Sequence, residues 1–156
     1  MPSPFCKVTD NLERVHWEKL VWNIPFNGLG VAGAAGYEAV ARGVVPSAEA
    51  LGPCLSSDQL LADARWERLA RELMMEVIAT ANTLGLKLPE SVAAEQIART
   101  HTMGAYKAST LIDFEQRRPL ELESMFLEPL RQAQSAGVAT PRLAALCEVL
   151  KGLDPA

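Results

Sequence analysis

The stretch DNLERVHWEKLVWNIPFNGLGVAG, residues 10–33, decides between two fold classes. Its Gly28, Gly30 and Gly33 spell G-x-G-x-x-G, the pattern with which a strand–turn–helix unit holds a dinucleotide diphosphate. That interpretation requires a buried strand before the first glycine and an acidic residue about 20 positions later. The residues before the glycines instead show apolar positions at near-helical spacing, behind a capping-box pattern that opens at Asp10. The stretch therefore predicts a helix that begins near Asp10 and runs into the glycines.

The downstream acidic residue that a dinucleotide site requires is Glu49, but it lies in VPSAEALG, residues 45–52. A proline-marked turn region of this kind does not form the end of a second strand. The glycine motif therefore meets neither the strand condition nor the acidic-residue condition. We interpret its glycines as positions where two elements approach closely or the backbone turns, and we keep a stand-alone nucleotide-binding site as a weaker hypothesis.

The rest of the chain repeats the helical pattern. Apolar residues about four apart follow the candidate helix starts, and no alternating run or Asn-Gly or Asp-Gly hairpin signal indicates a strand. The sequence therefore predicts an all-α fold. The expected helices are a short one within 36–45, a long one from Ser56 or Ser57 to Gly85, one from Pro89 to about Arg99, one from Ser109, one introduced by Pro119 and stopped by Gly137, and one from Thr140 and Pro141 to about Lys151.

Length and composition indicate one globular domain. The chain has 156 residues, 49 % of them hydrophobic and 22 % charged, with a formal net charge of −4. A chain of this size buries a core without disulfides or metal, and its charge argues against nucleic acid as a partner. The first residues lack the pattern of a signal peptide, and no apolar stretch reaches membrane-spanning length. We expect neither export nor membrane insertion, and a cytoplasmic location.

The cysteines and histidines indicate neither a disulfide framework nor a metal site. Cys6, Cys54 and Cys147 are odd in number and far apart. His16 and His101 have no acidic or cysteine partner at ligand spacing. We therefore predict no metal, assign both histidines a structural role and expect a reducing compartment.

A polar series leads into the glycines and is the first candidate site. Lys19, Asn23 and Asn27 stand at i, i+4 and i+8, so on a helix they project from one flank and could grip one small ligand. Pro25 interrupts the helical hydrogen bonds between the two asparagines. The alternative is a solvated helix edge without function. The aromatic side chains expected to wall such a pocket are Trp17, Trp22 and Phe26.

A second candidate group lies between residues 106 and 124. Ser109 stands at an expected helix start, where its hydroxyl and the free amides of the first turn could receive a carboxylate, or where it acts only as a cap. Glu121 and Glu123 begin the helix introduced by Pro119. The helix dipole favours acidic residues there without any function.

Three segments, taken in order, resemble the C-terminal domain of the ketopantoate reductase (2-dehydropantoate 2-reductase) family. They are KLVWNIPFN at 19–27, KASTLIDFEQRRPLELE at 107–123 and GVATP at 137–141, and the resemblance covers nearly the whole chain. It implies a multi-helix domain of the 6-phosphogluconate dehydrogenase C-terminal type. It also favours the polar series over the solvated helix edge.

The resemblance implies roles for the matching residues. In that family NADPH delivers a hydride to the 2-oxo carbon of a small acid, and the lysine matching Lys19 protonates the nascent alkoxide. Glu121 is the second catalytic residue that the match assigns. Asn23 and Asn27, together with Glu121, would hold the substrate hydroxyl, and Ser109 its carboxylate. Asp113 matches a frequent family residue to which we assign no chemistry.

The resemblance also implies a domain organisation. Residues 1–9 match the end of an interdomain connection, and residues 10–156 match a helical domain for substrate binding and dimerisation. The family's N-terminal Rossmann domain has no counterpart in this sequence, so the NADPH-binding residues stay unassigned and we expect the chain alone to be inactive. The expected setting is pantothenate biosynthesis by a homodimer. The alternative is a non-catalytic helical dimerisation or interaction module that has lost the cofactor domain.

Overall fold

The structure is a computed structural model that describes the backbone of residues 4–154 and the side chains of residues 12–154. Within that part the chain forms helices and no strand, which confirms the all-α prediction. The α-helices are α1 (Pro4–Ala32), α2 (Tyr37–Arg42), α3 (Ser57–Ala62), α4 (Ala64–Thr83), α5 (Ser91–His101), α6 (Ser109–Glu115), α7 (Glu128–Ser135) and α8 (Pro141–Leu153). Short 3-10 turns η1 (Gly33–Ala35) and η2 (Ala48–Ala50) and a π-helical turn η3 (Glu123–Leu127) complete the order.

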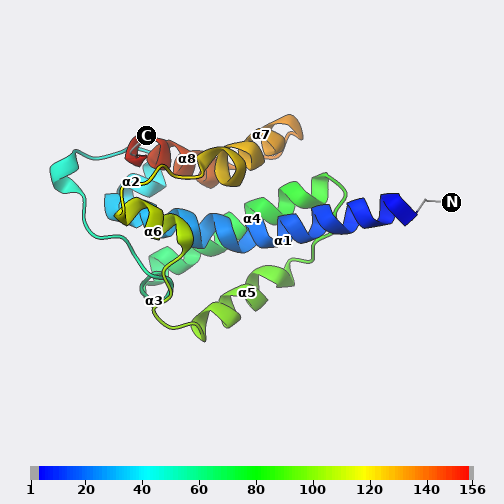
Figure 1. The fold of residues 1–156 in the computed structure, drawn as a ribbon, viewed down its shortest axis with the longest axis horizontal. Helices are drawn as coiled ribbons and strands as arrows, with labels where there is room; N and C mark the ends of the chain where they lie inside the picture. The colour runs from blue at the N-terminus through cyan, green and yellow to red at the C-terminus, as the bar shows by residue number, and fades with distance from the viewer. Residues whose placement is uncertain (1–3, 155–156) are drawn as a thin grey trace.

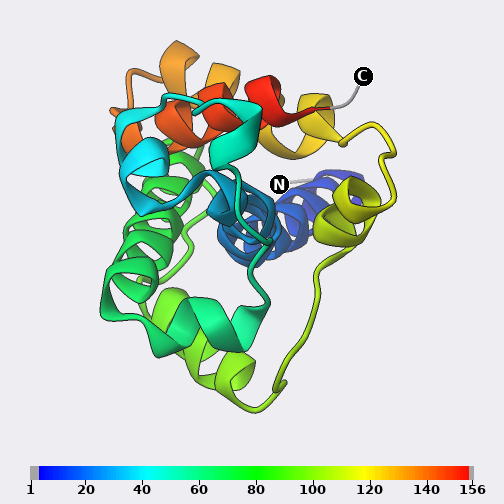
Figure 2. The same ribbon diagram turned by 90° about the vertical axis from the view of Figure 1, so that its left-hand side faces the viewer.

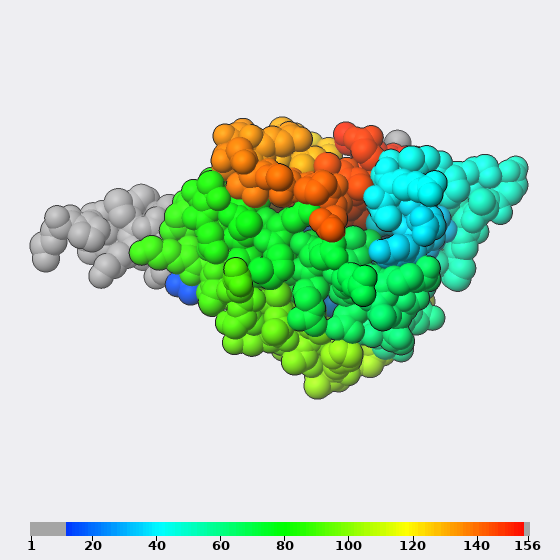
Figure 3. Space-filling view, turned by 180° about the vertical axis from the view of Figure 1, so that it is seen from behind, coloured from blue at the N-terminus to red at the C-terminus, as the bar shows by residue number. Residues whose placement is uncertain are grey.

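Helix α1 is the central element of the fold. The other helices surround its C-terminal half, with α4 alongside it, α7 and α8 on one side, and α5 and α6 on others (Figures 1 and 2). Seen from behind, α4 with α7 and α8 above it forms most of the surface (Figure 3). Between residues 12 and 23, α1 buries only one stripe, which includes Trp17, Leu20 and Val21, whereas residues 24–32 are buried all round. The polar series therefore spans the transition from the exposed to the enclosed part of α1.

The expected start of α1 is wrong. The helix begins at Pro4, so Asp10 lies inside it and does not cap it. Proline is well suited to the first turn of a helix, because its missing N–H needs no partner there, and no helix breaker follows before Pro25. Helix α1 thus runs across the expected domain boundary between residues 9 and 10.

The long helix expected from residue 56 to residue 85 is two helices. Ser56 is the N-cap, one of the two starts expected, and forms a capping box with Gln59, but α3 ends at Ala62. Asp63 has an extended backbone, and its carboxylate accepts a hydrogen bond from the Arg65 amide at 2.9 Å, which starts α4. An aspartate side chain that caps a new helix competes with continuation of the old one.

The remaining boundaries lie close to the predicted ones. The helix after Pro89 begins at Ser91, and the segment introduced by Pro119 becomes helical at residue 122. Gly85 and Gly137 follow helix ends with left-handed backbones, at φ of +89° and +74°, as expected of glycines that stop helices. Turn residues thus located the helix ends to within three positions.

The glycines of the G-x-G-x-x-G pattern are packing positions. Gly28 and Gly30 lie inside α1, and Gly33 begins η1, so the motif does not follow a strand. A Cβ on Gly28 would lie 2.7 Å from Leu146 Cδ2, and one on Gly33 would lie 2.6 Å from Leu55 Cδ1. The close approach of α8 to α1, and of the segment before α3 to η1, therefore requires small residues at these positions, which agrees with the packing interpretation.

Replacing Gly28 by alanine is expected to lower the free energy of unfolding by about 1–3 kcal/mol, because the added methyl overpacks the contact with Leu146. That cost exceeds the gain in helix propensity of about 1 kcal/mol. Urea unfolding followed by circular dichroism measures the change. Gly52→Ala is the control, since its Cβ would meet nothing closer than 3.9 Å. An unfolding midpoint of Gly28→Ala at or above that of the wild type contradicts the packing interpretation.

Candidate functional site

Burial of the polar series increases along α1. The Lys19 side chain is exposed, Asn23 is half-buried, and Asn27 is 3 % exposed. Within the part of the chain that the structure describes, Lys19 forms no ion pair. The site is therefore open at its charged end and closed at Asn27.

Asn27 joins α1 to the first turn of α6. Its Oδ1 accepts hydrogen bonds from the backbone N–H of Thr110 at 3.0 Å and from the Ser109 hydroxyl at 3.3 Å. Its Nδ2 donates to Oδ1 of Asn23 at 3.4 Å. The fold thus brings three of the predicted residues, Asn23, Asn27 and Ser109, into one hydrogen-bond network.

This network changes the interpretation of two residues. Ser109 is the first residue of α6, but its side chain does not cap the helix, so the alternative that it acts as a cap is wrong. The capping oxygen comes from Asn27, which serves a free amide of the first turn from a neighbouring helix. Asn27 thereby fixes the distance between α1 and α6 and orients the Asn23 amide.

Lys19 and Asn23 line a hollow between α1 and α5. Its volume is about 370 Å³, and its walls include Trp22 from α1 and Gln96 and Arg99 from α5. The Trp22 indole donates to Thr100 Oγ1 at 2.9 Å and stacks on Phe26 with 5.1 Å between ring centroids. Only one of the three aromatic residues expected at the pocket lines it, because Trp17 and Phe26 are buried in the core.

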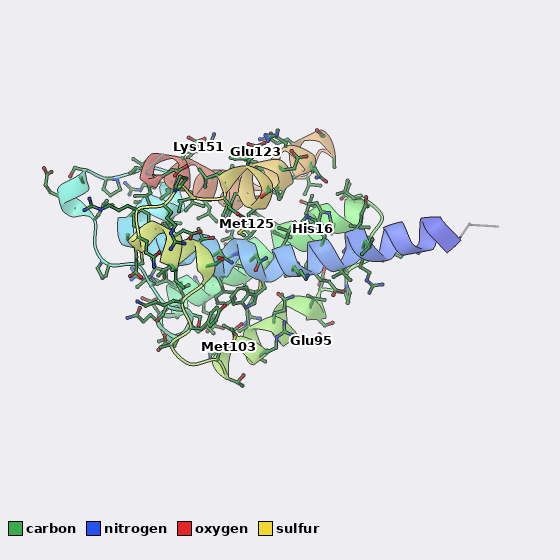
Figure 4. All side chains as sticks on the ribbon, viewed as in Figure 1. His16, Glu95, Met103, Glu123, Met125 and Lys151 are labelled. Carbon is green, nitrogen blue, oxygen red and sulfur yellow. The ribbon has the colours of Figure 1, made fainter. Side chains whose placement is uncertain are left out.

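Glu121 lies outside both the hollow and the Asn27 network. It is exposed and directly precedes the helical segment that contains η3. That segment contacts the start of α6 through Met125, whose Sδ is 3.9 Å from the Thr110 hydroxyl (Figure 4). Asp113 pairs with Arg118 at 3.3 Å, and Glu123 pairs with Arg131, so both have structural partners.

Four residues of the hollow were not predicted from the sequence: Val15 and Glu18 from α1, and Gln96 and Arg99 from α5. Gln96 and Arg99 face α1 from α5, and Gln96 is 8 % exposed. The available signal was a polar residue within the apolar stripe of α5, because Gln96 stands among the buried residues Val92, Ala93 and Ile97. A glutamine at such a position needs buried hydrogen-bond partners.

A carboxylate whose pKa is raised lies elsewhere and has a structural role. Glu76 of α4 accepts hydrogen bonds from the backbone N–H groups of Leu143 at 2.9 Å and Arg142 at 3.1 Å. Burial raises its pKa, and these two hydrogen bonds act in the opposite direction. Glu76 therefore supplies the N-terminal cap of α8 from a different helix.

The described residues contain no group of three or more acidic, histidine or cysteine side chains that could hold a metal ion. His16 and His101 are both exposed. Cys54 and Cys147 are free thiols, and burial raises their pKa to about 11 and about 12, whereas the Cys6 side chain lies outside the described residues. No described helix is both long and apolar enough to span a membrane.

Comparisons with known proteins identify a common family. The family model described as "Ketopantoate reductase PanE/ApbA C terminal" matches residues 39–154, a range that contains Ser109 and Glu121 but begins after Lys19, Asn23 and Asn27. A 2-dehydropantoate 2-reductase from Nostoc sp. is 36 % identical over 138 residues, covering 88 % of this chain and 37 % of the relative. One from Mesorhizobium japonicum is 25 % identical over 146 residues, covering 94 % and 38 %. The chain thus spans less than two fifths of these relatives.

Solved structures give the same result. The 2-dehydropantoate 2-reductase from Methylococcus capsulatus superposes with a TM-score of 0.75 at 30 % identity, over 91 % of this chain and 42 % of that one. The enzyme from Geobacter metallireducens GS-15 gives 0.73 at 36 % identity, over 90 % and 41 %. A dimeric ketopantoate reductase from Staphylococcus aureus, at 20 % identity, shares the fold with a TM-score of 0.68 over 91 % and 43 %.

Proposed function

Because the chain belongs to the family of ketopantoate reductase C-terminal domains, we propose that it is the substrate-binding and catalytic domain of an NADPH-dependent 2-oxoacid reductase. The substrate we propose is 2-dehydropantoate, reduced to pantoate in pantothenate biosynthesis. One observation carries the proposal: Lys19 and Asn23 line one hollow, and Asn23 is hydrogen-bonded into the network that contains Asn27 and Ser109.

The cofactor is assigned to a dinucleotide-binding domain rather than to the described residues. The glycine pattern of this chain lies at α1 and η1, and the space that a Cβ would fill there is occupied by Leu146 and Leu55. These residues do not fit a diphosphate, which needs an open loop at a helix N-terminus. NADPH bound in the other domain would supply the hydride to the 2-oxo carbon.

The residues of this chain would bind the oxygen atoms of the substrate and protonate one of them. We assign Lys19 to proton donation to the nascent alkoxide, and its positive charge stabilises that oxygen as negative charge develops. Asn23 and Glu121 are assigned to the substrate hydroxyl, and Ser109 to the carboxylate. Asn27 uses its Oδ1 on α6, so it contributes mainly by orienting Asn23. The exposure of Lys19 suits a site that a second domain completes.

The partners we propose are a small 2-oxo acid and a second copy of the chain. The dimeric ketopantoate reductase from Staphylococcus aureus shares this fold, which supports a homodimer. A cytoplasmic location suits an NADPH-dependent reductase of a biosynthetic pathway.

The test of this function compares 2-dehydropantoate with an analogue that lacks only the hydroxyl. A site built to hydrogen-bond a hydroxyl leaves its own polar groups unpaired with the analogue, so kcat/KM is expected to fall about a hundredfold or more. NADPH consumption at 340 nm measures it, with the dinucleotide-binding domain in the same chain or added as a second polypeptide. Asn23→Ala should reduce the difference between the two substrates. A loss below about threefold in the wild type would refute the assignment of the hydroxyl site.

A further inference from the structure

An exposed tyrosine packs against the wall of the hollow between α1 and α5. The Tyr106 ring meets the Trp22 ring edge to face, with 5.9 Å between their centroids, and Tyr106 is 44 % exposed. Trp22 lines the hollow together with Lys19 and Asn23. Covering an aromatic ring that remains in contact with water by an apolar group of a ligand is favourable. The wall therefore offers apolar surface beside two of the polar candidate residues.

Tyr106 also lies next to the other half of the candidate site. It belongs to the connection between α5 and α6, which runs along the outside of the molecule in Figure 2, and it precedes Ser109 by three residues. On α1, Trp22 directly precedes Asn23, whose amide oxygen accepts a hydrogen bond from Asn27. The pair of Trp22 and Tyr106 therefore lies between the hollow and the first turn of α6.

Contacts away from the exposed ring face hold the pair in place. The carbonyl oxygen of Tyr106 accepts a hydrogen bond from the backbone N–H of Ser57, the first residue of α3, at 2.9 Å. The Trp22 indole donates to Oγ1 of the buried Thr100 at 2.9 Å and stacks on Phe26. Among the described residues, the Tyr106 hydroxyl forms no hydrogen bond. The ring is thus presented by backbone and aromatic contacts, and its hydroxyl is not needed to position it.

We propose that Tyr106 is a specificity-determining residue, which together with Trp22 receives the two methyl groups on the third carbon of 2-dehydropantoate. The inference rests on the proposed function. The polar residues assigned above account for the oxygen atoms of the substrate and leave its methyl groups without a contact. An enzyme discriminates methyl groups where they cover apolar protein surface in the site. The substrates that this wall favours are therefore 2-oxo acids branched at the third carbon.

The test compares 2-dehydropantoate with 4-hydroxy-2-oxobutanoate, which lacks only the two methyl groups. The measured quantity is the selectivity ratio, kcat/KM for 2-dehydropantoate divided by kcat/KM for the analogue, from NADPH consumption with the dinucleotide-binding domain present. Tyr106→Ala is expected to lower this ratio about tenfold or more, because it removes the surface that the methyl groups cover. Both substrates are measured on the same preparation, so a smaller folded fraction of the variant leaves the ratio unchanged.

The matched control is Tyr37→Ala. Tyr37 of α2 also packs edge to face on a tryptophan, Trp66 of α4, with 5.4 Å between ring centroids, but it does not line the hollow. A selectivity ratio within about twofold of the wild type is expected for Tyr37→Ala and for Tyr106→Phe, which keeps the ring. A change below about threefold in Tyr106→Ala, or an equal change in Tyr37→Ala, would overturn the assignment. A ratio in Tyr106→Phe as low as in Tyr106→Ala would also overturn it, because the hydroxyl and not the ring would then make the contact.

The outcome is separable from that of the proposed function. If 2-dehydropantoate is reduced and the analogue without the hydroxyl is strongly discriminated against, but Tyr106→Ala keeps the selectivity ratio, only the Tyr106 assignment falls. If Tyr106→Ala lowers the ratio while loss of the hydroxyl has little effect, the methyl contact stands and the hydroxyl site falls. No reduction of 2-dehydropantoate by the wild type would overturn the proposed function and this inference together.

Discussion

Replacing Lys19 by alanine is expected to lower kcat for 2-oxo acid reduction by about two to four orders of magnitude, the usual contribution of a positioned general acid. The reason is that negative charge forms on the substrate oxygen only during hydride transfer. Hydride arrival at the 2-oxo carbon places negative charge on the oxygen, and an ammonium group both stabilises that charge and supplies the proton. Neither effect is needed in the ground state, so kcat should fall far more than KM rises.

Lys19→Arg separates the two contributions. Arginine keeps the positive charge but does not release a proton at physiological pH. A recovery of most of the activity by Lys19→Arg would show that charge, rather than proton donation, dominates. Activity close to that of Lys19→Ala would support proton transfer by the lysine. Steady-state kinetics with NADPH and 2-dehydropantoate, in the presence of the dinucleotide-binding domain, distinguishes these outcomes.

Lys151→Ala is the control for these variants. Lys151 lies on α8, on the side of α1 opposite α5, and its exposed ammonium is 3.4 Å from Glu148 (Figures 2 and 4). Exposed pairs of this kind contribute about 0–1 kcal/mol, so turnover should stay near that of the wild type. Wild-type turnover in Lys19→Ala as well would show that the general acid has been assigned to the wrong residue.

Local patterns in the sequence predicted most of the helices but not the break at Asp63. Periodicity and the serines at 56 and 57 as candidate caps identify α3 and the body of α4, because both features depend on neighbours within one turn. The break forms because Asp63 caps α4 with its side chain and so does not continue α3 as a helix-interior residue. The start at Pro4 was missed for a related reason: the capping-box pattern at Asp10 is also compatible with a helix interior.

The candidate site was only partly predictable, because its contacts are far apart in sequence. The i, i+4 spacing placed Lys19, Asn23 and Asn27 on one flank. Nothing local to Asn27 indicates that its amide oxygen caps α6, since the partner N–H belongs to Thr110, 83 positions away. Gln96 and Arg99 were missed because their place in the hollow depends on how α5 packs against α1. Glu121 was assigned through the family resemblance, and its role stays a prediction.

The largest expected loss of stability outside the site comes from Glu76→Ala, which should lower the free energy of unfolding by about 2–4 kcal/mol. The substitution leaves two N–H groups at the start of α8, those of Arg142 and Leu143, without their acceptor. The Leu143 amide is buried, so water does not replace the lost carboxylate freely. Urea unfolding measures the loss. Glu67→Gln on the same helix is the control, because it weakens only an i, i+4 pair with Arg71, which is expected to cost about 0.5 kcal/mol or less.

The burial of Glu76 determines whether its contribution to stability rises or falls with pH. Because the pKa of Glu76 is raised in the folded state above its ordinary value of 4.5, the folded protein binds more protons than the unfolded chain in the pH range just above 4.5. The contribution of Glu76 to stability therefore decreases as the pH rises from about 4.5 through the folded-state pKa, and is constant above it. Glu76→Gln, which keeps one acceptor oxygen and cannot ionise, should lack this decrease. A wild-type advantage over Glu76→Gln that grew with pH across this range would show that the two amide hydrogen bonds outweigh burial at this carboxylate.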